Sequence, residues 1–282
     1  MARNPSALPA YLTRLFGLAG RTAVVTGGSS GIGKEIALAL GQSGAAVILI
    51  ARRAGPLASA VEQLAQLGVP ATSITADLSN LADLHHASAR IRSAHGVPDI
   101  LVNAAGVSRR PPLPRVTQGD WDYAIAANLT APFALGQAFG PGMAERGSGR
   151  IINVAASQQS FRAPGGGGGG GGGAHGAAKG GLVSLTRSQA EAWSRSGVLC
   201  NAIAPGLVET PTTTTTTTTT GEEGEELPAD DADRAGAHAA RTMIGRNGVA
   251  EDFAGVAVWL ASGASAAVTG QTIFVDGGYS AT

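Results

Sequence analysis

The chain has 282 residues, and its 20 Lys and Arg balance 20 Asp and Glu, so the formal net charge is zero. That balance gives no electrostatic footprint for binding nucleic acid or an anionic membrane. Charged residues make up 14% and hydrophobic residues 44% of the chain, which excludes a disordered polyelectrolyte and predicts a globular protein with an ample core.

Cysteine content and the N-terminus favour a cytoplasmic protein. The single cysteine, Cys200, can form no internal disulfide, which is typical of a reducing compartment. The longest apolar runs are far shorter than the ~20 residues of a membrane helix, and residues 1–14 are interpreted as a short N-terminal extension. We therefore expect one cytoplasmic domain over residues 15–282, with no membrane, nucleic-acid or metal partner. Four histidines have no evident partner and no metal-site spacing: His85, His86, His95 and His238.

Seven short runs, most of them β-branched or apolar, alternate with helical patterns along the chain. Such runs are typical of strands buried on both faces of a parallel sheet. The predicted strands are Thr22–Thr26, Ala45–Ala51, Ala71–Thr75, Asp99–Asn103, Arg150–Val154, Val198–Ala204 and Thr272–Val275. The clearest predicted helices are Ile32–Gln42, Leu57–Leu67, Leu81–Ala94, Asp120–Phe139, Ala174–Ser194 and Ala250–Ala261. This alternation predicts an α/β, Rossmann-like fold, a doubly wound parallel sheet of about seven strands with helices on both faces.

Two homopolymers interrupt the alternation, nine glycines at Gly165–Gly173 and nine threonines at Thr212–Thr220. Holding nine glycines in a regular element would cost roughly 5–9 kcal/mol relative to alanine, which is comparable to the stability of a whole domain. We predict a loop for the glycine run and an irregular or extended chain for the threonine run, which has no apolar stripe. Two runs of identical length look like replacements of natural loop sequence.

The first predicted strand ends in a glycine-rich turn that leads directly into a helix. Glycines let the backbone turn sharply, and the amide groups at a helix N-terminus attract a pyrophosphate. A plain tight turn is the alternative, but the position between a buried strand and a helix favours cofactor binding. The turn therefore predicts a dinucleotide site formed by Gly27, Ser29, Ser30, Gly31, Ile32 and Gly33.

The spacing of Gly27, Gly31 and Gly33 resembles the short-chain dehydrogenase/reductase family, classical type. The resemblance covers roughly residues 17–282. It implies reversible hydride transfer between a nicotinamide cofactor and the carbon of a secondary alcohol or ketone, and a homotetramer or homodimer. Further motifs follow in the family's order: Asp77, Asn103-Ala104-Ala105-Gly106, Asn128 in Ala127-Asn128-Leu129-Thr130-Ala131, Lys179 in Ala177-Ala178-Lys179-Gly180-Gly181, and Pro205-Gly206.

The end of the second strand bears on the choice of cofactor. In these folds a carboxylate there binds the ribose 2′-hydroxyl, whereas an arginine accommodates a 2′-phosphate. The chain has Arg52 and Arg53 at this place and no acid. The pair favours NADP(H), with NAD(H) possible, and the alternative is a solvated charge pair at a helix start.

The resemblance implies further cofactor contacts. Asp77, with Leu78 beside it, would meet the adenine, and Asn103 to Gly106 would line the adenosine side of the cleft. Lys179 would hold the nicotinamide ribose. The segment at about 207–245 corresponds to a substrate lid and contains the threonine run. Contacts to the nicotinamide carboxamide map onto Pro205, Gly206, Val208 and Thr210.

The family's catalytic tyrosine is missing. In the family a Tyr transfers the substrate proton, and a Lys four residues later holds the ribose and lowers the pKa of that Tyr. Here Lys179 is present, but His175 stands four residues before it. Residues i and i+4 of a helix share a face, so His175 occupies the expected place. Imidazole is a competent base, although the neighbouring ammonium disfavours its charged form and makes it a weak acid for ketone reduction.

The family's serine is displaced as well. It falls where Ala156 stands, with Ser157 one residue later. A one-residue shift turns a strand side chain to the opposite face, which a bulge at the strand end could restore. Ser157 is our candidate, with Ser160 behind it. The predicted catalytic residues, including the asparagine that in the family supports a water relay, are Asn128, Ser157, His175 and Lys179.

Two alternatives to an enzyme that uses His175 stay open at this point. One is a catalytically impaired dinucleotide-binding scaffold, because the tyrosine is missing, the serine is shifted and the lid is degenerate. Tyr123 or Tyr279 could supply a phenol only by reaching Lys179, and both fall in other elements. The second alternative is that the sequence near residues 156–175 and 212–226 departs from the natural one, in which case the natural protein is an ordinary active enzyme.

Overall fold

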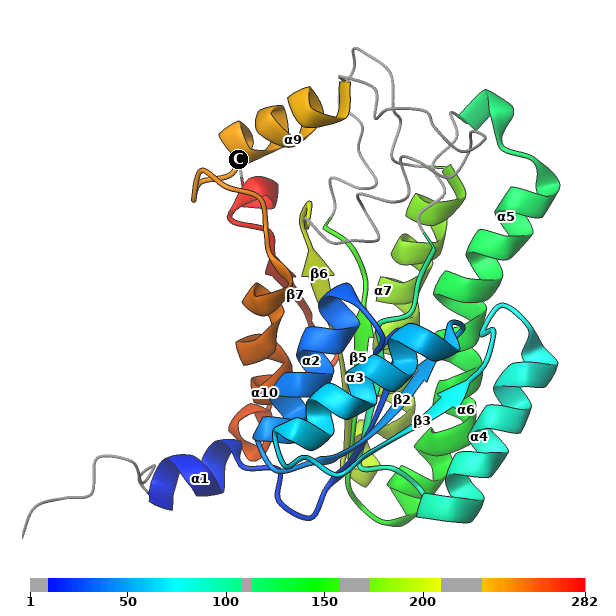
Figure 1. Cartoon of the computed structure of the whole chain (residues 1–282), viewed down its shortest axis with the longest axis vertical. Helices are drawn as coiled ribbons and strands as arrows, with labels where there is room; N and C mark the ends of the chain where they lie inside the picture. Colours follow the sequence, from blue (N-terminus) through cyan, green and yellow to red (C-terminus); the bar gives the residue numbers. More distant parts are fainter. Residues whose placement is uncertain (1–9, 108–112, 158–172, 209–229, 282) are drawn as a thin grey trace, which may run out of the picture.

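The computed structural model describes residues 10–107, 113–157, 173–208 and 230–281. Figure 1 shows a central sheet with helices packed on both of its faces. All seven strands are parallel and follow the order β3-β2-β1-β4-β5-β6-β7. The doubly wound α/β prediction is therefore confirmed. The strands, which match the predicted ones to within a residue at each end, are β1 Thr22–Thr26, β2 Ala46–Ala51, β3 Ala71–Thr75, β4 Ile100–Asn103, β5 Gly149–Val154, β6 Val198–Pro205 and β7 Thr272–Val275.

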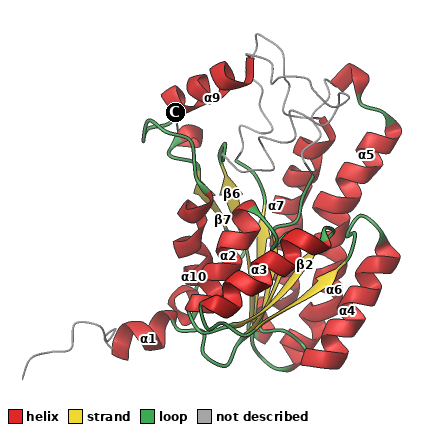
Figure 2. Cartoon of the chain, viewed as in Figure 1, coloured by secondary structure: helices red, strands yellow, loops and turns green. Residues whose placement is uncertain are grey.

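The helices include two that we did not predict. The first, α1, lies at the boundary between the expected N-terminal extension and the domain, and the second, α9, lies in the expected lid segment (Figure 2). α7 begins at Gly173, so the loop predicted for the glycine run is wrong at its last residue. The rest of that run and the threonine run lie outside the described residues. The helix bounds are α1 Ala10–Phe16, α2 Gly31–Gln42, α3 Ala54–Gln66, α4 Leu81–His95, α5 Gln118–Ile125, α6 Ala131–Glu145, α7 Gly173–Trp193, α9 Asp230–Arg241 and α10 Ala254–Ala261.

Two hydrophobic layers enclose the sheet, because successive strand residues point to opposite faces. Val25 and Leu49 belong to the layer beneath α2, α3 and α10. Val24 and Ile48, one residue away along each strand, belong to the layer beneath α4, α6 and α7. The strands are therefore apolar on both faces, as a sheet covered by helices on both sides requires.

The helix predicted over residues 120–139 is longer and is interrupted by a π-helical turn. The turn at Ala126–Thr130 lies between α5 and α6 and contains Asn128. Thr117 begins α5 with a capping box, in which its hydroxyl oxygen accepts a hydrogen bond from the Asp120 amide at 3.1 Å. Since π-helical turns are often found at functional sites, the interruption draws attention to Asn128.

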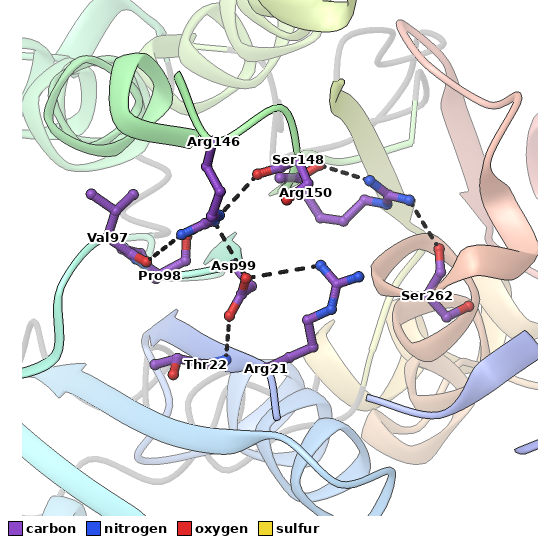
Figure 3. Close-up of polar contacts among 10 residues, drawn as sticks. Arg21, Thr22, Val97, Pro98, Asp99, Arg146, Ser148, Arg150 and Ser262 are labelled. Atoms are coloured by element: carbon purple, nitrogen blue, oxygen red, sulfur yellow. Dashed lines mark hydrogen bonds and ion pairs between the residues drawn. The ribbon is translucent and has the colours of Figure 1, made fainter. Parts of the chain in front are cut away.

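A charged cluster at the amino ends of the strands fixes the far end of the sheet (Figure 3). The Asp99 carboxylate accepts a hydrogen bond from the Thr22 amide at 2.8 Å and lies 3.4 Å from an Arg146 nitrogen. Arg146 also donates to the Val97 carbonyl at 2.8 Å. The starts of β1 and β4 and the end of α6 are thereby tied together, at the edge opposite the glycine-rich turn.

Candidate active site

The turns after β1 and β4 touch each other at the point where the strand order reverses. Gly27 has φ of 67°, and a side chain there would place its Cβ 2.8 Å from the Ala105 backbone. A Cβ on Gly33 would lie 2.5 Å from the Gly27 carbonyl oxygen. Only glycine fits both places. Open sheets of this kind bind ligands in the crevice at such a switch point.

The first turn of α2 offers its backbone amides without competition from a side-chain cap. α2 begins at Gly31, which has φ of 53°, and the N-cap residue Ser30 makes no side-chain hydrogen bond to the helix. A helix N-terminus left in this state attracts an anion. The glycine cradle and the uncapped helix therefore fit the pyrophosphate of a dinucleotide.

Thr26 joins the two turns and was overlooked in the sequence. Its hydroxyl accepts hydrogen bonds from the amides of Ala104 and Ala105, each at 3.0 Å, and donates to the Val102 carbonyl at 3.3 Å. The residue is buried. The predicted cofactor-binding residues that follow β4 are thus held in place from β1.

The side chain of Asn103 points into a buried polar network. Its amide nitrogen donates to Asn153 at 2.8 Å, and Asn153 donates in turn to Thr186 and Gln189 of α7, each at 2.9 Å. The Asn103 side-chain oxygen is buried and has no hydrogen-bond partner among the described residues. The network ties β4 and β5 to the helix that contains His175 and Lys179.

Lys179 lies buried at the carboxyl end of β5. Its ammonium donates to the Val154 carbonyl oxygen at 2.6 Å, and only 5% of the residue is exposed. Loss of hydration lowers the pKa of Lys179 from 10.5 to about 8. A Cβ placed on Gly106 would lie 3.5 Å from this nitrogen and 2.7 Å from the Asn128 side-chain oxygen. Lys179 and Asn128 therefore lie close to Gly106.

Asn128 is fully buried, and both ends of its amide are hydrogen-bonded to backbone. Its nitrogen donates to the carbonyls of Val107 at 3.1 Å and Ala124 at 3.0 Å. Its oxygen accepts from the Val107 amide at 3.2 Å. The π-helical turn thus holds the loop that follows β4 in a fixed position.

His175 faces the same backbone group. Its Nδ1 lies 3.0 Å from the Val107 carbonyl oxygen. Because a carbonyl only accepts, Nδ1 must be the protonated nitrogen, and in the neutral ring Nε2 is then the basic one. His175 and Lys179 are both buried on α7, one turn apart. The structure thus brings Asn128, His175 and Lys179 together around residues 106–107.

Ser157 is buried just beyond β5. The amides of Ala155 and Ser157 donate to Ile203 and Pro205, at 2.8 and 2.7 Å, which continues the two-residue period of the ladder. The described strand end thus has no bulge between Ala155 and Ser157, and Ser157 faces the opposite side from Ala156. The displacement expected from the sequence is not reversed. Ser160 lies outside the described residues.

The remaining cofactor candidates lie along the same edge of the sheet. The Asp77 carboxylate accepts from the Ser79 amide at 2.9 Å and hydroxyl at 2.7 Å, which fixes the turn after β3. Arg52 donates to the phenol oxygen of Tyr123, and Arg53 is exposed at the N-cap of α3. Thr210 lies outside the described residues. Four other candidates lie at this edge. Leu78 and Val208 are buried, Pro205 ends β6, and the Gly206 amide donates a hydrogen bond to the Val275 carbonyl.

The described part of the lid segment docks on the C-terminal turn. His238 of α9 stacks on Tyr279 with ring centroids 4.1 Å apart, and its Nδ1 lies 3.0 Å from the Asn247 side-chain oxygen. The Arg241 guanidinium lies 4.6 Å from the centre of the Tyr279 ring. The prediction that His238 has no partner is therefore wrong. Its partners, Tyr279 and Asn247, lie in other segments of the chain, so sequence spacing did not indicate them.

The described part of the chain contains neither a membrane-spanning helix nor a cluster of metal-ligating side chains. No helix in this part of the chain is long and apolar enough to cross a membrane. No group of three or more His, Cys, Asp or Glu there could hold a metal ion.

Comparisons with known proteins match almost the whole chain. The family model described as enoyl-(acyl carrier protein) reductase matches residues 27–280. Gluconate 5-dehydrogenase of Gluconobacter oxydans is 36% identical over 264 residues, which cover 94% of this chain and 96% of that protein.

Two solved structures share the fold closely. A putative NAD(P)-dependent gluconate 5-dehydrogenase from Beutenbergia cavernae, with bound NADP, has a TM-score of 0.83 and 38% identity, covering 95% of this chain and 99% of that one. A gluconate 5-dehydrogenase from Burkholderia cenocepacia, in complex with NADP and tartrate, has a TM-score of 0.83 and 32% identity, covering 96% and 99%. The family-model match over residues 27–280 includes the turns after β1 and β4.

Proposed function

The chain belongs to the short-chain dehydrogenase/reductase family, and from that premise we propose that it is an NADP(H)-dependent enzyme that interconverts a secondary alcohol and a ketone. Its relatives are oxidoreductases that act on CH–OH groups. The observation that carries the proposal is the convergence of Asn128 and His175 on the Val107 backbone, with Lys179 one helical turn away.

Support for NADP(H) comes from the edge of the sheet beside β2. Arg52 and Arg53 follow this strand, and no acid stands where one would bind a ribose 2′-hydroxyl. The Beutenbergia and Burkholderia relatives were both solved with NADP. Gly27 and Gly33 let the turn pack directly against the backbone of Ala105 and of Gly27 itself, which a Cβ at either position would prevent.

In this mechanism the nicotinamide cofactor supplies the hydride acceptor or donor. During alcohol oxidation, Nε2 of His175 takes the proton from the substrate hydroxyl, and the ring becomes an imidazolium. The Val107 carbonyl holds the ring through Nδ1 in both protonation states, since Nδ1 keeps its proton. Asn128 fixes Val107 and thereby the orientation of the base.

Lys179 supplies positive charge near Gly106. With a pKa of about 8, its ammonium is mostly protonated at neutral pH. One of its protons is held by the Val154 carbonyl, and two remain to bind the hydroxyl groups of a ribose. Ser157 faces the side opposite Ala156, so it has no role in the proposed mechanism.

The comparisons do not support an impaired scaffold. The relatives that match 94% of the chain are dehydrogenases and reductases. In the proposal, His175 takes over the proton transfer that the family assigns to tyrosine. We further propose that the chain forms a homotetramer or homodimer and works in the cytoplasm. Light scattering on the purified protein measures the mass of the assembly.

The deciding experiment follows the absorbance of the reduced nicotinamide with a panel of ketones and alcohols that includes gluconate and 5-ketogluconate. The wild-type chain is compared with His175→Tyr and His175→Phe. Turnover by the wild type that the Phe variant loses supports the proposal. Turnover by the Tyr variant alone would show that His175 does not perform the proton transfer, and no binding of NADP(H) by any of the three would contradict the cofactor assignment.

A further inference from the structure

One hydrogen bond joins the end of β2 to α5, two segments far apart in the sequence. Nη1 of Arg52 donates to the phenol oxygen of Tyr123, 71 residues away in the sequence. Arg52 follows β2, and Tyr123 lies on α5, which comes after β4. In the sheet β2 and β4 lie on opposite sides of β1. Arg52 lies two residues beyond Ile50, which pairs with Thr26, so the contact lies near the carboxyl end of β1, where the glycine-rich turn begins.

The phenol is a neutral acceptor, and this decides what Arg52 can still do. A guanidinium has five N–H donors in a rigid fork, so one bond to Tyr123 leaves the others available. No acid forms an ion pair with Arg52 within the described residues. Arg52 thus keeps its full positive charge while one edge of the guanidinium is held. A carboxylate in place of the phenol would have cancelled that charge.

We propose that Tyr123 is a positioning residue that holds the Arg52 guanidinium for the 2′-phosphate and thereby sets the preference for NADP(H) over NAD(H). The inference rests on the proposed function. A 2′-phosphate gains from a guanidinium whose fork is already oriented, because less side-chain entropy is lost on binding. A ribose 2′-hydroxyl has no charge to pair with it, so the orientation of Arg52 matters little to NAD(H).

Other contacts already hold the helix that contains Tyr123. The capping box of Thr117 and Asp120 begins α5, and Asn128 bonds the Ala124 carbonyl near its end. Arg52 is exposed, and its bond to Tyr123 lies at the surface. An exposed bond of this kind adds little to stability. Removing the phenol oxygen should therefore weaken nucleotide binding while leaving the stability of the fold nearly unchanged.

The test measures the dissociation constants of NADP+ and NAD+ by calorimetry on the full chain. Tyr123→Phe removes only the acceptor oxygen, and it should weaken NADP+ binding roughly three- to tenfold while NAD+ changes less than about twofold. Arg52→Ala should weaken NADP+ binding further. The double variant should match Arg52→Ala, because the phenol acts through the arginine. Tyr11→Phe, the same change on the distant α1, is the control that should alter neither constant.

A replacement that keeps an acceptor gives an independent check. Tyr123→Gln offers a side-chain oxygen to Arg52 and should recover part of the NADP+ affinity. The inference is overturned if Tyr123→Phe weakens both nucleotides equally, leaves both unchanged, tightens NADP+, or weakens NADP+ by the same factor in the Arg52→Ala background. A wild-type chain that binds neither nucleotide, or prefers NAD+, contradicts the NADP(H) proposal itself.

Discussion

Lys179 donates its ammonium proton to the carbonyl oxygen of Val154 over 2.6 Å, at the place where β5 ends. The lysine is buried, and the loss of hydration lowers its pKa to about 8. A charge held in this environment costs folding free energy, since one carbonyl replaces only part of its hydration. The fold tolerates that cost at the centre of the candidate site, as is typical of catalytic residues.

The first prediction is that Lys179→Met changes the pH dependence of stability. The folded pKa lies below the unfolded value of 10.5, so the cost of Lys179 is fully present below about pH 8. This cost disappears as the pH rises from 8 towards 10.5, because the lysine then loses its proton in the folded protein but keeps it in the unfolded protein. The stability of the wild type relative to the variant should therefore rise by about 2 kcal/mol between pH 7 and pH 10.

Urea denaturation of both proteins at several pH values measures this difference. Groups that titrate identically in the two proteins cancel in the comparison. Lys179→Arg, which keeps its charge throughout the range, is the matched control and should show no such rise relative to the Met variant. A constant gap between wild type and Lys179→Met from pH 7 to pH 10 would contradict the lowered pKa of Lys179.

The second prediction concerns Asn128. Asn128→Ala removes three hydrogen bonds and leaves the amide and carbonyl of Val107 without that partner. We expect a loss of unfolding free energy of about 2–4 kcal/mol, together with a fall in kcat, because His175 depends on the same carbonyl. Denaturation and steady-state assays measure the two effects, and undiminished turnover would show that Val107 does not orient the base.

The strands and the glycine-rich turn could be predicted because their signals are local. Runs such as Thr22–Thr26 are apolar on both faces, and this is readable without knowledge of any partner. α9 could not be predicted, because its docking depends on the stacking of His238 against Tyr279, which lies in another segment. The π-helical turn at Ala126–Thr130 could not be predicted either, because its sequence continues the helical pattern on both sides of it.

In the candidate site, too, local features could be predicted and contacts between distant segments could not. The four-residue interval between His175 and Lys179 places both on α7, so their shared location could be read from the sequence. Their hydrogen-bond partners could not, because Val107 and Val154 come from other strand ends. The contact between Arg52 and Tyr123 is of the latter kind, since it depends on how α5 lies over the sheet.

The third prediction separates two glycines. Gly27→Ala places a methyl group 2.8 Å from the Ala105 backbone at a φ of 67°, so it should abolish nucleotide binding and destabilise the fold by at least about 1 kcal/mol. Gly255→Ala is the control, because nothing lies within 4 Å of its added carbon and the residue is helical. This second change should stabilise the protein by about 0.5–1 kcal/mol. Thermal denaturation and calorimetry with NADP+ measure both variants, and binding by Gly27→Ala would contradict the cradle.

The last prediction tests His175 as the base. His175→Phe keeps a planar ring but removes both nitrogens, and it should lower kcat for alcohol oxidation about 100-fold or more, the usual contribution of general base catalysis. The dissociation constant of NADP+ should stay within about twofold, since the proposed role of the ring is proton transfer. His86→Phe, an exposed change on α4, is the control for losing one imidazole. A Phe variant that retains wild-type kcat would remove His175 from the mechanism.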